Sequence, residues 1–205
     1  MGVFIAIDGP NGVGKTSFIN KLEKRLNVQY DVILTKEPSN TEYGNKIRIN
    51  EGNYKGLDYA RLIAYDREYH IKNEIMPAYQ SDNIIISDRY VASSLALQFL
   101  DGVALQDIWN LNKGFLKPSL YIILTAIPEV IEGRLKLRDK LTYFETTKSR
   151  KEELDAFCQA HFFLRSHGWD TIMLNSNTVM EQNDNTEFVY NWIVNNKERY
   201  SEQNN

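Results

Sequence analysis

Cysteine is almost absent from this chain, which has Cys158 alone among its 205 residues, and an internal disulfide is therefore excluded. The three histidines, His70, His161 and His167, are scattered, and no CxxC pattern or histidine pair accompanies the cysteine. We therefore expect no zinc-type metal site. We interpret the histidines as surface or core residues with satisfied hydrogen bonds, and the cysteine as a helix-packing residue rather than a nucleophile. A reducing cytoplasm is the simplest setting for such a chain.

The sequence also lacks long apolar runs and a strong charge of one sign. No run approaches the roughly 20 apolar residues that a membrane-spanning helix needs, and the first expected strand begins at Val3, so we expect neither a membrane partner nor a signal peptide. The formal net charge is -3, which argues against nucleic acid as the main partner. A small phosphorylated substrate fits, because it needs only local cations. We expect one domain over residues 1–205.

What the sequence does contain is a phosphate-binding motif after an apolar run. Val3–Asp8 is rich in β-branched residues and suits a buried parallel strand. The next residues match GxxxxGK[ST], in which backbone N–H groups cradle phosphates, the lysine reaches the outer ones and the hydroxyl holds Mg²⁺. Apolar residues at helical spacing follow, so strand, loop and helix occur in the required order. The expected ATP-binding residues are Gly9, Asn11, Gly12, Val13, Gly14, Lys15, Thr16 and Ser17.

Further apolar runs predict four more strands, over residues 31–36, 83–88, 118–126 and 171–175. Residues at helical spacing lie between them, and they predict a long helix over 57–80, a helix opening at Pro128 and a closing helix over 180–200. Strands that alternate with helices favour an α/β fold. We predict a three-layer sandwich with a central five-stranded parallel sheet, which with the phosphate-binding motif is of the P-loop NTPase type.

Charged residues stand where two of these strands end. Glu37 follows the second strand, and Asp88 and Arg89 follow the third. Ligands bind at the carboxyl ends of parallel strands, where an aspartate can hold Mg²⁺ and an arginine can grip phosphate. We therefore predict that Thr16 and Asp88 hold the metal and that Glu37 belongs to the substrate site. The alternatives are a solvated loop carboxylate at Glu37 and a plain ion pair between Asp88 and Arg89.

A basic segment follows the fourth strand. Residues 134–145 include Arg134, Lys136, Arg138 and Lys140 between two helical stretches. In phosphoryl transfer the protein mainly supplies cations that neutralise the transferring group, and a closing cover excludes water. The segment therefore predicts a lid over about residues 136–150. A solvated basic helix face is the alternative.

Together these motifs resemble those of the thymidylate kinases, P-loop nucleoside monophosphate kinases that transfer the γ-phosphoryl of ATP to dTMP. The resemblance covers nearly the whole chain, and it rests on residues 35–41, 64–67, 87–94, 128–130 and 134–145. It implies a fold of the nucleotide kinase type with a small lid, ATP and Mg²⁺ as cofactors, and a homodimer as the assembly. The residues that it implies as catalytic are Lys15, Arg89, Arg134 and Arg138, with Arg134 and Arg138 in the lid. The residues that it implies for substrate binding are Asn11, Glu37, Ile63, Arg67, Arg89, Ser94 and Gln98, with Arg67 and Arg89 on the acceptor phosphate.

Three departures from the family's pattern concern the acceptor. Asn11 stands where the family usually has an acidic residue that can meet the sugar 3′-hydroxyl. Ile63 stands where a phenylalanine commonly stacks on thymine, and base stacking is worth about 1–3 kcal/mol in nucleic-acid sites. Finally, Tyr143 and Phe144 precede Glu145 in place of the usual lid arginine, and either ring could contact the base instead.

Three functions are compatible with these patterns. The first is phosphoryl transfer to a nucleoside monophosphate, dTMP above all, which needs no general base because the attacking phosphate oxygen is already anionic. The second is a deoxynucleoside kinase in which Glu37 serves as the base. The third is a nucleotide-binding regulatory protein without catalysis. Arg67, Arg89 and the lid cations speak against the third, since a switch does not need to clamp an acceptor phosphate.

Overall fold

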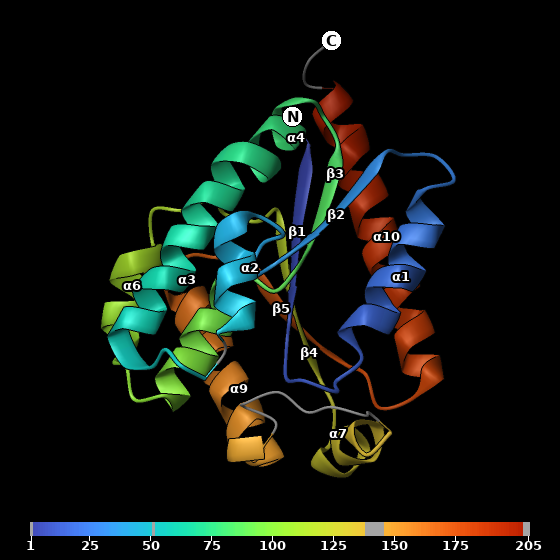
Figure 1. Ribbon diagram of the computed structural model, residues 1–205. Helices are drawn as coiled ribbons and strands as arrows, with labels where there is room; N and C mark the ends of the chain where they lie inside the picture. Colours follow the sequence, from blue (N-terminus) through green and yellow to red (C-terminus); the bar gives the residue numbers. More distant parts are fainter. Residues whose placement is uncertain (1, 51, 138–145, 203–205) are drawn as a thin grey trace.

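The computed structural model describes residues 2–50, 52–137 and 146–202. Their core is a five-stranded sheet in the order β2-β3-β1-β4-β5, with every neighbouring pair parallel (Figure 1). The predicted α/β fold and the number of strands are confirmed. The strands are β1 (Val3–Asp8), β2 (Val32–Lys36), β3 (Ile84–Asp88), β4 (Leu120–Thr125) and β5 (Thr171–Asn175).

Helices cover both faces of this sheet because the central strand is apolar on both. Val3, Ile5 and Ile7 of β1 pack in one cluster with residues of α1 (Lys15–Leu26) and α10 (Val179–Glu202). Phe4 and Ala6 point to the opposite face and pack with residues of the remaining large helices. In Figure 1 α1 and α10 lie on the right of the sheet, and α3 (Gly56–His70), α6 (Leu105–Asn112) and α9 (Arg150–Ser166) lie on the left. The three predicted layers follow from this alternation.

The predicted long helix over 57–80 is one helical path with a change of geometry inside it. It consists of α3 (Gly56–His70), a π-helical segment η1 (Ile71–Ile75) and α4 (Met76–Gln80). A second π-helical segment, η2 (Ser94–Gln98), continues α5 (Val91–Ser93) after β3. The sequence patterns predict neither segment nor the short helices α2 (Glu42–Ile49) and α6 (Leu105–Asn112). The remaining helices are α7 (Pro128–Leu135) and α9 (Arg150–Ser166).

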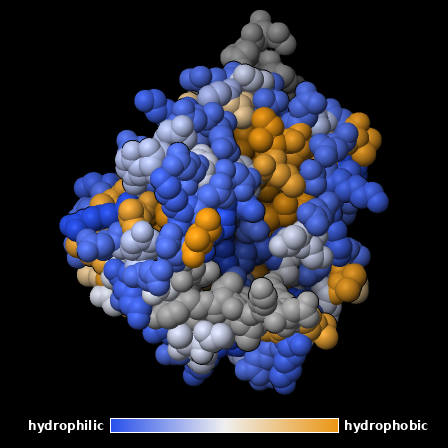
Figure 2. Space-filling model, in the orientation of Figure 1, coloured by the Kyte–Doolittle hydropathy of each residue, from blue (hydrophilic) through white to orange (hydrophobic). Residues whose placement is uncertain are grey.

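The strand order leaves β2 at one edge of the sheet. Ile33 and Leu34 are each 38% exposed there, whereas the central strand β1 is fully buried. Figure 2 shows the resulting apolar area over β2 and, below it, a hydrophilic recess at the centre of the same face. Nowhere in the described ranges is a helix long and apolar enough to cross a membrane.

The sheet register sets where a ligand can be held. Asp88 is opposite Ile7 of β1 on one side and Lys36 of β2 on the other. The residues that follow these positions, Glu37 and Arg89 among them, therefore leave the sheet at one edge together with the glycine-rich loop. This is the carboxyl edge, where ligands of open parallel sheets bind.

Candidate active site

The glycine-rich loop turns sharply between β1 and α1. Gly9 has a φ of 139°, and a Cβ there would lie 2.4 Å from the carbonyl oxygen of Leu124 on the neighbouring strand. Gly14 has a φ of 107° directly before α1, a conformation that side chains other than glycine's rarely tolerate. Helix α1 begins at Lys15, so its first N–H groups and its positive dipole end meet the loop. The backbone is thereby shaped to hold an anion.

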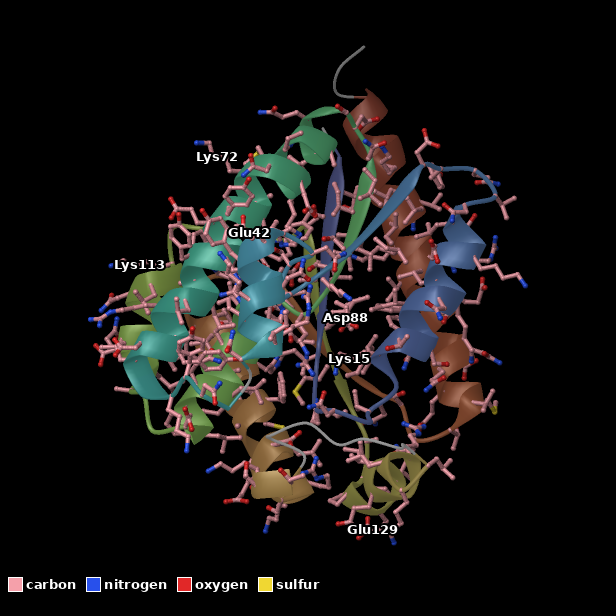
Figure 3. The ribbon with its side chains drawn as sticks, viewed as in Figure 1. Lys15, Glu42, Lys72, Asp88, Lys113 and Glu129 are labelled. Atoms are coloured by element: carbon pink, nitrogen blue, oxygen red, sulfur yellow. The ribbon has the colours of Figure 1, made fainter. Side chains whose placement is uncertain are left out.

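Lys15 is buried in this loop and bonded to the loop's own backbone. Its Nζ donates to the carbonyl oxygens of Gly9 (2.9 Å) and Pro10 (3.0 Å). Burial, together with the nearby Arg89 guanidinium, lowers the pKa of Lys15 to about 7. Figure 3 shows Lys15 and Asp88 together at the centre of the molecule. The ammonium has no carboxylate hydrogen-bonded to it in the described residues, which leaves its charge for an incoming phosphate.

A cavity of about 450 Å³ opens above the loop. Most of the residues predicted to bind ATP line this cavity. The two predicted metal ligands and two of the arginines predicted to be catalytic line it as well. Gly9 and Val13 are the exceptions, since both are buried behind the cavity wall and contribute through their carbonyl oxygens. The lining residues are Asn11, Gly12, Gly14, Lys15, Thr16, Ser17, Asp88, Arg89 and Arg134.

The two predicted metal ligands, Thr16 and Asp88, both line this cavity. Thr16 is exposed to it, and the Oδ1 atom of Asp88 is buried without a hydrogen-bond partner among the described residues. An unpaired carboxylate oxygen beside a hydroxyl suits Mg²⁺, which prefers oxygen and is usually held by few protein ligands plus phosphates and water. Consistently, the described part of the chain holds no cluster of three acidic, histidine or cysteine residues that would form a complete metal cage.

Arg89 stands at the junction of two cavities. Its φ is 76°, an uncommon left-handed conformation for a residue other than glycine, and its backbone N–H donates to the carbonyl oxygen of Ile7 at 2.9 Å. Its side chain donates to Ser93 Oγ at 2.9 Å and to Asn11 Oδ1. These bonds direct the guanidinium across the mouth of the loop. The uncommon backbone conformation of Arg89 thus occurs where its side chain is held between the two cavities.

The second cavity, of about 210 Å³, lies beside the first and shares Asn11 and Arg89 with it. One wall is apolar, made by Pro38, Ile47, Tyr59, Ile63 and Leu97, and the rest is polar or cationic. All seven residues predicted for the substrate line this cavity. The polar and cationic lining residues are Asn11, Glu37, Arg48, Arg67, Arg89, Ser93, Ser94 and Gln98.

Comparison with known proteins decides between the families that combine such cavities. The family model described as thymidylate kinase matches residues 7–182. The chain belongs to the thymidylate kinase family. It is 41% identical to the thymidylate kinase of Caldicellulosiruptor saccharolyticus over 154 residues, which is 71% of this chain and 75% of that protein. It is 40% identical to the probable thymidylate kinase of Thermococcus gammatolerans over 157 residues, 71% of this chain and 76% of that protein.

In this thymidylate kinase family member, Arg67 is buried in the wall of the second cavity, with 1% of its surface exposed. One edge of its guanidinium is ion-paired, because Nε and Nη2 lie 2.7 and 2.6 Å from Glu37 Oε2. Its Nη1 meets neutral partners, Ser94 Oγ at 3.1 Å and Asn112 Oδ1. A phosphate oxygen can replace a neutral hydroxyl more readily than a carboxylate. The Nη1 side is therefore the one available to an anion.

Glu37, a residue that the sequence predicts for the substrate site, is engaged at both carboxylate oxygens. Oε2 meets Arg67, as above, and Oε1 lies 3.3 Å from Nδ1 of His70. His70 is fully buried, with its Nε2 2.6 Å from Thr35 Oγ1. The interpretation of the histidines as satisfied surface or core residues did not identify this network with Glu37. The signal was present in its spacing, since His70 lies three residues after Arg67 on one helix, within reach of the same partner.

Two further polar residues of the site escape the sequence patterns. Glu153 of α9 is fully buried behind the loop, where its Oε2 accepts a long hydrogen bond of 3.4 Å from the backbone N–H of Asn11. Burial raises the pKa of the Glu153 carboxyl, although Arg150 lies 3.0 Å away. Asp8, at the end of β1, is also buried and accepts from the backbone N–H of Tyr90 and the hydroxyl of Tyr121. Burial raises its pKa too.

Arg134, which the family resemblance implies as a lid cation, lines the first cavity. It lies in the last turn of α7, and its guanidinium donates to the carbonyl oxygens of Val13 and Ser176, both at 2.7 Å. Arg134 therefore ties the phosphate loop to the segment between β5 and α10, because α7 extends further than the sequence pattern indicates. Arg138, Tyr143 and Phe144 lie outside the described residues, as do residues 138–145 of the lid predicted over about 136–150.

Proposed function

We propose that this protein transfers the γ-phosphoryl group of ATP to dTMP, giving ADP and dTDP. The observation that carries the proposal is the meeting of two cavities at Asn11 and Arg89. The first cavity is lined by the phosphate loop and its buried lysine. The second cavity is lined by cationic side chains and by an apolar wall. Donor and acceptor phosphates held in the two cavities would face each other across the Arg89 guanidinium, as in-line transfer requires.

The residues at this junction supply charge neutralisation. Lys15 would leave the carbonyl oxygens of Gly9 and Pro10 for the outer phosphates of ATP, and Arg89 would bridge the transferring group and the acceptor. Thr16 and Asp88 would hold Mg²⁺, which when bound draws charge from the phosphate oxygens. The acceptor oxygen is already anionic, so no base is needed. The positioned cations therefore account for the chemistry that this site performs.

The second cavity supports a pyrimidine acceptor. Its apolar wall suits the face of a small base and the 5-methyl group of thymine. Gln98 is 3% exposed, and its Oε1 has no hydrogen-bond partner within the part of the chain that the structure describes. An unpaired carbonyl oxygen in a cavity wall is satisfied by a donor such as the N3–H of thymine, whereas cytosine offers an acceptor at that position. These features favour dTMP over dCMP.

The arrangement of Glu37 argues against the deoxynucleoside kinase. A general base needs a free carboxylate oxygen at the hydroxyl that it deprotonates, and both oxygens of Glu37 face Arg67 and His70. A regulatory protein without catalysis would not need the two arginines on the acceptor side. Phosphoryl transfer to a nucleoside monophosphate gives both arginines a role, because they would bind the acceptor phosphate.

The test is an assay of ADP release with ATP and Mg²⁺ over a panel of nucleoside monophosphates and the matching nucleosides. We expect dTMP to be the best acceptor, dCMP to be poor and thymidine to be inactive. The Lys15→Ala variant is the control and should lose turnover with every acceptor. Phosphorylation of nucleosides alone would establish the deoxynucleoside kinase, and turnover of no acceptor would establish the regulatory protein.

We also propose that the protein is a homodimer, as the family resemblance implies. Light scattering tests this proposal.

A further inference from the structure

We propose that His70 is a positioning residue for the acceptor phosphate, acting through Glu37 on Arg67. The proposal rests on the proposed function, because it concerns the same acceptor site. His70 does not line either cavity of the site. It lies at the end of α3, one element behind the wall, and reaches the acceptor only through the carboxylate in front of it.

The ring of His70 is held between two elements. Its Nε2 lies 2.6 Å from the hydroxyl of Thr35 on β2, and its Nδ1 lies 3.3 Å from Glu37 Oε1 in the segment that follows β2. Glu74 of η1 also approaches Nε2, at 3.4 Å, from the protein surface. An ionised carboxylate accepts hydrogen bonds and cannot donate them. Nδ1 therefore carries the hydrogen that is shared with Glu37, and Thr35 fixes the plane of the ring.

This hydrogen bond determines how Glu37 meets Arg67. With Oε1 held by His70, the carboxylate presents Oε2 alone to the Nε and Nη2 atoms of Arg67. The guanidinium is then oriented with Nη1 toward Ser94, in the wall of the acceptor cavity. Without a donor on Oε1, a buried carboxylate oxygen would lack a partner, and Glu37 would rotate to spread both oxygens over Arg67. Nη1 would then turn away from the acceptor phosphate.

Two substitutions at His70 separate this role from simple packing. The amide nitrogen of asparagine falls close to the position of imidazole Nδ1, and that of glutamine close to Nε2. His70→Asn thus keeps the donor to Glu37 and loses the contact with Thr35, while His70→Gln does the reverse. We expect His70→Gln to raise the KM for dTMP roughly ten- to hundredfold, the effect of one lost hydrogen bond to a charged group. His70→Asn should raise it less than about threefold, and the KM for ATP should stay unchanged in both.

His161 provides the matched control. It is another buried histidine bonded to a threonine, with its Nδ1 2.8 Å from Thr171 Oγ1, and it lines neither cavity of the site. His161→Asn and His161→Gln should change the thermal midpoint and leave the KM for dTMP unaltered. If the two His70 variants raise this KM equally, or if they raise the KM for ATP in parallel, His70 acts only through packing and the proposal is wrong.

A double-mutant cycle tests whether His70 acts through Glu37. Glu37→Gln should raise the KM for dTMP by itself, and His70→Gln added to it should raise the KM little further, because both act through one contact. Additive effects would contradict the proposed route. Calorimetric binding of dTMP gives the same comparison without turnover. An inactive wild-type enzyme would therefore overturn the proposed function, while equal dTMP affinities of His70→Asn and His70→Gln would overturn the role of His70.

Discussion

The protonation of Lys15 should change when ATP binds to the phosphate loop. In the ligand-free site its ammonium is buried, has two carbonyl oxygens as partners and lies near Arg89, and its pKa falls from the usual 10.5 to about 7. The outer phosphates of ATP would supply the missing negative charge and return the pKa toward its ordinary value. Binding of ATP above neutral pH should therefore be coupled to uptake of a proton by Lys15.

The size of this uptake follows from the pKa. With a value of about 7, Lys15 is about 10% neutral at pH 6, half neutral at pH 7 and about 90% neutral at pH 8. The expected uptake per ATP is therefore about 0.1, 0.5 and 0.9 protons at these three pH values. Isothermal titration calorimetry in buffers of different ionisation enthalpy measures it directly. The phosphates of the magnesium complex are fully ionised at pH 8, so they contribute no proton there.

The control is Lys15→Met, which should bind ATP weakly and without proton uptake. An uptake near zero at pH 8 in the unmodified protein would refute the reasoning, because it would show that the buried ammonium stays charged.

The lowered pKa of Lys15 also has a consequence for the stability of the protein. Between about pH 7 and the usual value of 10.5 the unfolded chain binds more protons at this residue than the folded one. The contribution of Lys15 to the free energy of unfolding should therefore rise with pH across this window.

Two other substitutions test the acceptor wall and the support beneath the site. Ile63→Phe places a ring in the wall that Tyr59 also lines, and stacking should lower the KM for dTMP about fivefold; an unchanged or higher KM would show that stacking is not the missing interaction. Tyr121→Phe removes a hydroxyl that donates to Asp8 and accepts from the backbone N–H of Ala92, so urea unfolding should show a loss of about 1–3 kcal/mol. Tyr190→Phe removes a hydroxyl whose bond to Gln29 is long, at 3.5 Å, and should lose far less; equal losses would contradict the account.

The parts of the site that the sequence predicts are those encoded by neighbouring residues. The phosphate loop follows from the order of strand, glycines and helix, and Asp88 and Arg89 follow from their place at the end of an apolar strand. Both are local patterns, which a sequence shows directly. Ser94 and Gln98, which the family resemblance implies for substrate binding, line one cavity through a π-helical segment that periodicity does not reveal.

The contacts that the sequence does not predict join residues far apart in the chain. Glu153 meets Asn11 across 142 positions, and His70 meets Glu37 across 33. These pairings depend on how α9 and α3 pack against the sheet, which no local pattern specifies. The end of α7 was likewise beyond the sequence pattern, because Arg134 is charged and its helix is short. The hydrogen bonds of Arg134 to Val13 and Ser176 show that this residue of α7 contacts the phosphate loop.

The neutral side chain at Asn11 follows from the charges around it. Its Oδ1 accepts from Arg89, and its backbone N–H donates to the buried carboxylate of Glu153. An aspartate at this position would put a second carboxylate beside Glu153 and would ion-pair with the guanidinium that the acceptor phosphate needs. Asparagine accepts the same hydrogen bond without that charge, so Arg89 keeps its own for the phosphate.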